Sequence, residues 1–207
     1  MQYNGIMTSL PARVLAVLAA IAAAVFLSSC SSPASDGHTD HEHTEEPVIT
    51  GQPAGFNADD VSFATNMIPH HQQAVELSAL VPDRSTNPEL VALAQQVSAA
   101  QQPEIETMKV FLVQWKENPD AGSGHEGHGA PMAGMVDEGT MTKLESLNGP
   151  EFDKLWLESM INHHQGAIEM AKAEIANGEN VDAKRMAQTI IDTQQAEIGQ
   201  MKQMLGG

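Results

Sequence analysis

Residues 67–76 of the chain read M-I-P-H-H-Q-Q-A-V-E, and residues 160–169 read M-I-N-H-H-Q-G-A-I-E. The similarity extends beyond this motif, because residues 60–112 align without a gap to residues 153–205, which lie 93 positions further along the chain. Eighteen of these 53 pairs are identical. Self-similarity at one fixed spacing is typical of a duplicated structural unit, so we interpret this part of the chain as two copies of one repeat.

Each repeat is predicted to fold as a pair of helices. In the first helix, Met67, His70 and Ala74 recur at the three- and four-residue spacing of one helical face. The second helix is predicted between Leu90 and Leu112, where apolar residues recur at the same spacing. The second copy follows this pattern, so the sequence predicts two helical hairpins.

The ends of these helices carry capping residues. Asn87 precedes Pro88, a favoured combination of N-cap and first helical position, and Asn180 repeats the cap in the second copy. Gly178 is placed to end the helix that precedes Asn180. A short extra helix is predicted near residues 140–147, leading into the second repeat.

The predicted fold class is all-α, a four-helix bundle built from two duplicated helical hairpins. Two hairpins present four apolar faces, and one shared core buries them all. An aromatic content of 4% argues against a β-sandwich or barrel. We expect the duplicated domain over residues 57–206, composed of repeat 1 over 57–117, a linker over 118–139 and repeat 2 over 140–206.

The charge balance excludes several classes of partner. The formal net charge of −17 argues against nucleic acid, because phosphate binding depends on Lys and Arg. It also argues against docking on anionic lipid through a basic patch. A single Cys excludes an internal disulfide framework and any Cys-based zinc or iron–sulfur cluster. Acidic groups together with 9 His and 12 Met indicate a metal cation as the partner.

The N-terminus reads as a targeting segment. Arg13 precedes an apolar run over residues 14–27 that is too short to span a bilayer comfortably but suits a signal-peptide core. Leu27-Ser28-Ser29-Cys30 then resembles the bacterial lipoprotein signal, so we predict a lipoprotein signal peptide over 1–29 and lipidation of Cys30. An ordinary signal peptide with an incidental Cys is the alternative.

The mature chain is therefore expected in the bacterial cell envelope, lipid-anchored on the outer side of the cytoplasmic membrane, whether periplasmic or on the cell surface. Residues 30–56 are rich in Ser, Pro, Gly, His and acidic residues, and we predict that they form a disordered tether. Histidines at positions 38, 41 and 43 give this tether a composition typical of metal binding.

Two copies of a Met-x-x-His-His motif carry the predicted chemistry. Met67 lies three and four residues before His70 and His71, so one thioether and two imidazoles share a helical face. The second copy has the same spacing. The six candidate metal ligands are Met67, His70, His71, Met160, His163 and His164.

The type of ligand narrows the type of metal. Thioether sulfur is soft and selects Cu(I), while imidazole also accepts Cu(II), zinc, iron or nickel. A mixture of Met and His without Cys favours copper, with Cu(I) ahead of Cu(II). Di-iron bundles use Glu-x-x-His pairs, and here a Met stands three residues before the first His. The sequence leaves open whether the motifs form one shared site or two, or whether the histidines are only hydrogen-bonded core residues.

Other residues are accessory candidates. In an antiparallel hairpin the His patch should face the level of Gln101 and Glu104, so the second His of each motif is either a ligand or is hydrogen-bonded to the carboxylate. We interpret Met108 and Met201 as core residues ahead of ligands, and the linker is rich in His and Met. The accessory candidates are Glu104, Glu197, Met108, Met201, His125, His128, Met132 and Met135.

Four motifs are similar to a known family. M-I-P-H-H-Q-Q-A-V-E-L, F-D-K-L-W-L-E-S-M-I-N-H-H-Q-G-A-I-E-M-A, the Q-Q-x-E-I-x-x-M-K stretches and P-M-A-G-M resemble the bacterial domain of unknown function 305, over about residues 57–206. The resemblance implies a ferritin-like four-helix bundle that is usually secreted or membrane-anchored. Some relatives are implicated in periplasmic copper binding and copper tolerance. It implies that the six candidate ligands hold the metal, with Met132 and Met135 as an accessory.

Three hypotheses about function follow. The first is an extracytoplasmic copper-binding lipoprotein that serves copper buffering, tolerance or transfer. The second is a metal-dependent oxidase on a ferritin-like scaffold, although no nucleophile motif or glycine-rich phosphate loop is found and we assign no enzymatic activity. The third is a structural or interaction module. The predicted partners are a metal ion and, through lipidated Cys30, the membrane; the sequence identifies no protein partner.

Overall fold

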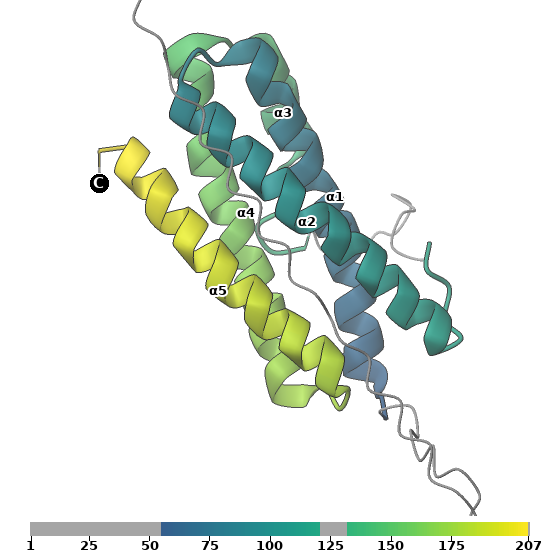
Figure 1. Cartoon of the computed structure of the whole chain (residues 1–207). Coiled ribbons are helices and arrows are strands. Elements are labelled where there is room, and N and C mark those ends of the chain that lie inside the picture. Colours follow the sequence, from purple (N-terminus) through teal and green to yellow (C-terminus); the bar gives the residue numbers. More distant parts are fainter. Residues whose placement is uncertain (1–54, 121–131, 207) are drawn as a thin grey trace, which may run out of the picture. The chain divides into compact units, whose positions relative to one another are not determined.

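The described part of the chain is helical. A computed structural model describes residues 55–120 and 132–206, and within these residues it contains five helices (Figure 1). The all-α prediction is therefore confirmed. The helices are α1 Ala58–Arg84, α2 Pro88–Gln114, α3 Glu138–Ser146, α4 Gly149–Asn177 and α5 Val181–Met204.

The four long helices pack as two hairpins, as predicted from the repeat. α1 packs along α2, and α4 packs along α5. The hairpins are joined mainly through α1 and α4, whereas α2 and α5 share fewer contacts. The short helix α3 precedes α4 and packs against it, where an extra helix was predicted. The arrangement confirms the four-helix bundle.

Side-chain caps explain where the helices begin. The Asn87 side chain accepts hydrogen bonds from the backbone N–H groups of Glu89 and Leu90 at the start of α2, and Asn180 caps α5 in the same way. Both predicted N-caps are therefore confirmed. Asn57 forms a capping box with Asp60 at the start of α1, an N-cap that was not predicted.

Gly178 ends α4 as predicted, but for a different physical reason. Its φ of −63° is not left-handed, so the freedom of glycine to adopt positive φ is not needed here. Glycine is required because there is no space for a side chain: a Cβ at this position would lie 2.4 Å from Glu174 Oε1 and 2.8 Å from Asp60 Oδ1. Two carboxyl groups therefore pack against the backbone of the α4–α5 turn.

Asp60 ties the start of α1 to the turn between α4 and α5. Its Oδ2 accepts backbone hydrogen bonds from Asn57 at 2.6 Å and Glu179 at 3.1 Å. Its Oδ1 accepts one from the backbone of Asn180 at 2.9 Å. A buried aspartate with three N–H donors is well compensated, so this residue joins the two repeats at one end of the bundle.

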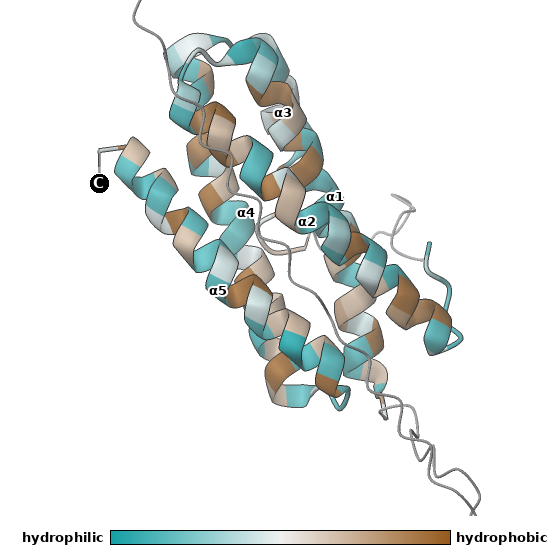
Figure 2. Cartoon of the chain, in the orientation of Figure 1, coloured by the Kyte–Doolittle hydropathy of each residue, from teal (hydrophilic) through white to brown (hydrophobic). Residues whose placement is uncertain are grey.

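The core consists of two apolar clusters, one toward each end of the bundle. The first includes Phe63, Met67, Met108 and Ala167, and the second includes Leu77, Leu90, Trp156, Met160 and Met201. Figure 2 shows apolar and polar residues interleaved along each long helix.

Between the two apolar clusters, each long helix contributes buried polar residues. On α1 the first cluster ends at Ile68 and the second begins at Ala74, and the order is reversed on the antiparallel helix α4. We call the buried side chains between the clusters the polar layer. Its members are His70, His71, Gln101, His163, His164, Gln194 and Glu197.

Among the described residues, no helix combines the length and the apolar character that a membrane crossing requires. The predicted signal peptide, residues 1–29, and residues 30–54 of the predicted tether lie outside the described residues, and only Gly55 and Phe56 of the tether are described.

Candidate metal centre

The four motif histidines lie in the polar layer with no exposed surface. His70 and His71 come from α1, and His163 and His164 come from α4, and each has a relative exposure of 0%. Adjacent helical residues point in different directions, so burial of both histidines in each pair shows that a broad face of each helix is covered. The predicted inward orientation is therefore present in both repeats.

The two motifs meet at the centre of the bundle. The ring centroids of His70 and His163 are 3.8 Å apart, with the planes inclined by 38°. The rings of His163 and His164 are 6.4 Å apart. His70, His163 and His164 therefore form one histidine cluster across the α1–α4 contact.

The second histidine of each motif is paired with a glutamate. His71 Nε2 lies 2.8 Å from Glu104 Oε2, and His164 Nε2 lies 2.8 Å from Glu197 Oε2. These are the facing carboxylates that the hairpin model predicted. A carboxylate that accepts the Nε2 proton orients the ring and leaves Nδ1 as a lone-pair donor, an arrangement common behind metal-bound histidines.

The two histidine–glutamate pairs differ in their surroundings. The Glu104 side chain is 16% exposed, whereas the Glu197 side chain is only 1% exposed. Gln96 from α2 also donates a hydrogen bond of 3.2 Å to Glu197 Oε1. The pair in the second repeat is therefore more deeply buried and is braced by the first repeat.

Several polar atoms of the layer have no hydrogen-bond partner in the described structure. Buried polar groups are normally satisfied, so this group of unsatisfied atoms makes the layer the candidate site. These atoms suit a metal that accepts imidazole nitrogen. They are Nδ1 of His70, His71 and His164, both ring nitrogens of His163, both amide atoms of Gln101 and Oε1 of Gln194.

The first histidine of each motif is held in the neutral form. Burial lowers the pKa of His70 from 6.5 to about 3, and electrostatic repulsion between the His70 and His71 rings adds to this effect. Burial also lowers the pKa of His163 well below its ordinary range, again with a contribution from a neighbouring ring. Neutral imidazoles keep a free lone pair at neutral pH, which is the form that binds metals.

The motif methionines are fully buried, one turn from the histidines. Met67 belongs to the first apolar cluster and Met160 to the second, so a thioether borders the polar layer on each side. Within the described residues, no three His, Cys, Asp or Glu side chains form a ready metal-binding group. A metal site in the polar layer would therefore need the methionine sulfur atoms as ligands or a rotation of the histidine rings.

The accessory candidates fall into separate places. Met108 and Met201 are fully buried in the apolar clusters, in agreement with a core role. Met132 and Met135 are half-buried in a turn beside His70. His125 and His128 lie outside the described residues, as does Cys30.

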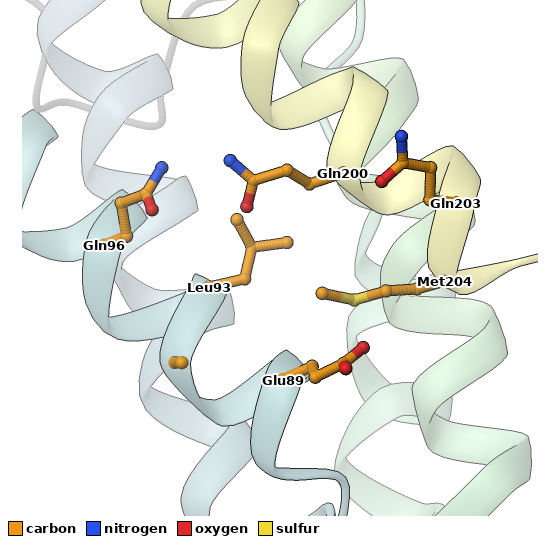
Figure 3. Close-up of a pocket in the computed structure, with 7 residues that line it drawn as sticks. Glu89, Leu93, Gln96, Gln200, Gln203 and Met204 are labelled. Atoms are coloured by element: carbon orange, nitrogen blue, oxygen red, sulfur yellow. The ribbon is translucent and has the colours of Figure 1, made fainter.

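A groove on another face contains none of the six candidate ligands. It has a volume of about 460 Å³ and lies between Glu89, Leu93 and Gln96 of α2 and three residues of α5 (Figure 3). Gln96 connects this groove to the polar layer, because its side chain donates a hydrogen bond to Glu197. The α5 residues are Gln200, Gln203 and Met204. The histidine cluster itself is closed by packing.

Two features of the site were not identified from the sequence. Gln73 exchanges two hydrogen bonds with the backbone of Val136, and the Ala133 carbonyl lies 3.3 Å from His70 Nε2. The available signal was the alignment of the repeats, in which Gln73 is replaced by Gly166 beside an otherwise shared His-His-Gln sequence.

A family model described as domain of unknown function (DUF305) matches residues 60–205. The chain belongs to this family. None of the curated proteins compared with the chain matches it.

Solved structures resemble the chain over most of its length. The Cu(II)-bound form of CopM is 35% identical, with a TM-score of 0.61, over 70% of this chain and 94% of that one. The Cu(I)-bound form of CopM is 32% identical, with a TM-score of 0.59, over 70% and 94%. A candidate secreted DUF305 protein from Streptomyces coelicolor is 31% identical, with a TM-score of 0.62, over 72% and 92%.

Proposed function

We propose that the protein binds copper, with Cu(I) preferred, through the duplicated Met-x-x-His-His motifs, and that it buffers or transfers copper outside the cytoplasmic membrane. The observation that carries the proposal is the polar layer, in which buried, neutral and unsatisfied imidazole nitrogens lie between two thioethers. The solved CopM structures with Cu(I), Cu(II) and silver support it, because that protein has the same fold.

In this proposal the residues have distinct roles. His70 and His163 supply imidazole nitrogens from opposite hairpins, and Met67 and Met160 supply the soft donors that favour Cu(I) over harder ions. Glu104 and Glu197 orient the second histidine of each motif. Bound metal would satisfy polar atoms whose burial otherwise destabilises the bundle.

The proposal is tested by removing sulfur while keeping shape. Leucine is close in volume to methionine, so Met67→Leu with Met160→Leu should preserve packing. We expect Cu(I) affinity, measured by competition with a chromophoric chelator, to fall about tenfold or more. Zn(II) affinity should change little, because zinc does not require thioether ligands.

The matched control is Met108→Leu with Met201→Leu, which alters buried methionines of the same apolar clusters. This control should bind Cu(I) as the wild type does. Equal Cu(I) affinity in the wild type and in both double variants would contradict a role for Met67 and Met160. If the wild type binds no Cu(I), the whole proposal fails.

We also propose that Cys30 is lipidated and anchors the protein to the membrane. The support is its position after an apolar run and two small residues. In a bacterial expression host, the wild-type protein should partition with membranes and carry the mass of acyl chains. Cys30→Ala should abolish both properties. A membrane fraction that still contains unmodified Cys30→Ala protein would contradict the lipid anchor.

A further inference from the structure

The segment beside the histidine cluster is a tight turn. The backbone N–H of Met135 donates to the carbonyl of Met132 at 3.1 Å, and Gly134 has a φ of +82°. A positive φ at the third position is typical of a type II turn, which explains the glycine. We call residues 132–135 the Met turn.

Gln73 of α1 fastens the end of the Met turn. Its Nε2 donates to the Val136 carbonyl at 2.8 Å, and its Oε1 accepts from the Val136 N–H at 2.8 Å. One amide side chain therefore satisfies both backbone groups of one residue, as a neighbouring strand would. Gln73 is three residues after His70, so the two side chains lie on one face of α1.

The other side of the Met turn rests on the backbone of α4. A Cβ at Gly166 would lie 1.9 Å from the Ala133 carbonyl oxygen, and a Cβ at Gly134 would lie 2.5 Å from the Asn162 carbonyl oxygen. Gly166 is the counterpart of Gln73 in the second repeat. The two repeats thus differ at the position where one must hold the turn and the other must make room for it.

This difference breaks the symmetry of the central histidines. The Ala133 carbonyl lies 3.3 Å from His70 Nε2, and because a carbonyl only accepts, this nitrogen carries the proton. His163, the counterpart of His70, makes no hydrogen bond of ordinary geometry at either nitrogen within the described structure, and has only a weaker polar contact with the His70 backbone. The Met turn therefore fixes the tautomer and orientation of one ring and leaves the other unconstrained by hydrogen bonds.

We propose that Gln73 is a positioning residue for copper binding. Gln73 holds the Met turn, so that Ala133 fixes the His70 ring with Nδ1 facing the site. This constraint slows exchange of the metal. This inference rests on the proposed copper function. The held ring supplies a preorganised donor, and the turn lies against His70, so loosening the turn speeds both entry and release of the ion.

The experiment compares the full mature protein with Gln73→Ala, which removes both hydrogen bonds, and Gln73→Glu, which keeps only the acceptor. Gly166→Ala pushes the turn away from the opposite side. Gln165→Ala, on the exposed face of α4, is the matched control. The first readout is the ¹⁵N spectrum of the His70 ring in metal-free protein, and the second is the rate of Cu(I) release to a chelator.

In the wild type and in Gln165→Ala, the His70 ring should show a single tautomer with the proton on Nε2. Gln73→Ala and Gly166→Ala should show averaged tautomers and release Cu(I) about tenfold faster, as expected from the loss of one or two hydrogen bonds. The equilibrium affinity should change less than the release rate, because entry accelerates too. Gln73→Glu should lie between wild type and Gln73→Ala.

Two outcomes separate this inference from the proposed function. If the wild type binds Cu(I) but Gln73→Ala changes neither the His70 ring signal nor the rate of Cu(I) release, the positioning role alone is overturned. A wild type that binds no Cu(I) overturns the proposed function, and it does so whatever the ring spectrum shows.

Discussion

His163 stands out among the residues of the polar layer. Its ring is fully buried and contacts His70, yet neither of its nitrogens makes a hydrogen bond of ordinary geometry in the described structure. An unsatisfied buried polar atom costs about 1–3 kcal/mol. Such a residue weakens the apo fold, which is the expected signature of a side chain retained for a ligand.

Replacing His163 should therefore increase the stability of the metal-free protein. We expect His163→Leu to raise the free energy of unfolding by about 1–3 kcal/mol, because an apolar side chain needs no partner between two apolar clusters. Chemical denaturation of the apo protein measures this change. Destabilisation by His163→Leu would indicate a purely structural histidine.

His164→Leu is the comparison variant, since it leaves Glu197 buried without its ring partner. It should destabilise the apo protein by about 1–3 kcal/mol, because the buried Glu197 carboxyl group then keeps only the hydrogen bond from Gln96. Opposite signs for two adjacent histidines would distinguish the ring without a hydrogen-bonded carboxylate from the ring that Glu197 holds.

Glu174 provides a prediction about pH. Burial raises its pKa from 4.5 to about 8, and the hydrogen bond and charge of Asp60 add to the shift. Burial alone would raise the pKa of Asp60 too. Hydrogen bonds from the backbone of Asn57, from the Glu174 side chain, and from the backbone of Asn180 and Glu179 hold this pKa below its ordinary value. The pair is therefore a protonated Glu174 beside an ionised Asp60.

The sign of the pH effect follows from this pair. Between about pH 4.5 and about 8 the folded protein keeps the Glu174 proton that the unfolded chain releases, so this contribution to stability falls as pH rises. The slope is at most about 1.4 kcal/mol per pH unit. Glu174→Gln should remove this slope in denaturation curves, while Glu169→Gln, on the exposed face of α4, should retain it.

At the scale of elements, the helix starts show which local signals carry stability. Asn87 caps α2 through two side-chain hydrogen bonds, whereas Asn148, at the same position before α4, makes no side-chain cap. We expect Asn87→Ala to lower the free energy of unfolding by about 1 kcal/mol and Asn148→Ala to have little effect. Equal losses for both variants, measured by thermal unfolding, would show that the cap is not responsible.

The helices themselves could be predicted because their signals are local. Asn87 with Pro88, and Asn180 in the repeat, mark helix starts through a hydrogen bond that closes within three residues. Gly178 was correctly placed at a helix end, but its reason depends on Glu174 and Asp60, which are close only in the folded chain. Local sequence therefore predicted the boundary and not its cause.

At the scale of the molecule, metal binding and folding should be linked, because the proposed ligands come from both hairpins. Cu(I) at about a hundredfold excess over its dissociation constant should stabilise the protein by about 2.7 kcal/mol. For a domain of this size that corresponds to a rise in Tm of roughly 5–10 °C. Calorimetry under anaerobic conditions measures it.

The control for this linkage is the double variant Met67→Leu with Met160→Leu, which should show a much smaller rise at the same Cu(I) concentration. Zn(II) should raise the Tm of the wild type and the variant equally. If Cu(I) shifts the Tm of neither protein, the histidine cluster serves only the core.

The repeat, the helical hairpins and the inward-facing Met-x-x-His-His motifs were determined by the sequence, since periodicity and duplication are properties of the chain itself. The pairing of His71 with Glu104 was also predictable, because an antiparallel hairpin fixes which turns face each other. Only the tertiary structure decided that His70 meets His163, and that the Met turn holds one ring and not the other. These depend on how α1 packs against α4, and no spacing within a single helix or hairpin encodes that packing.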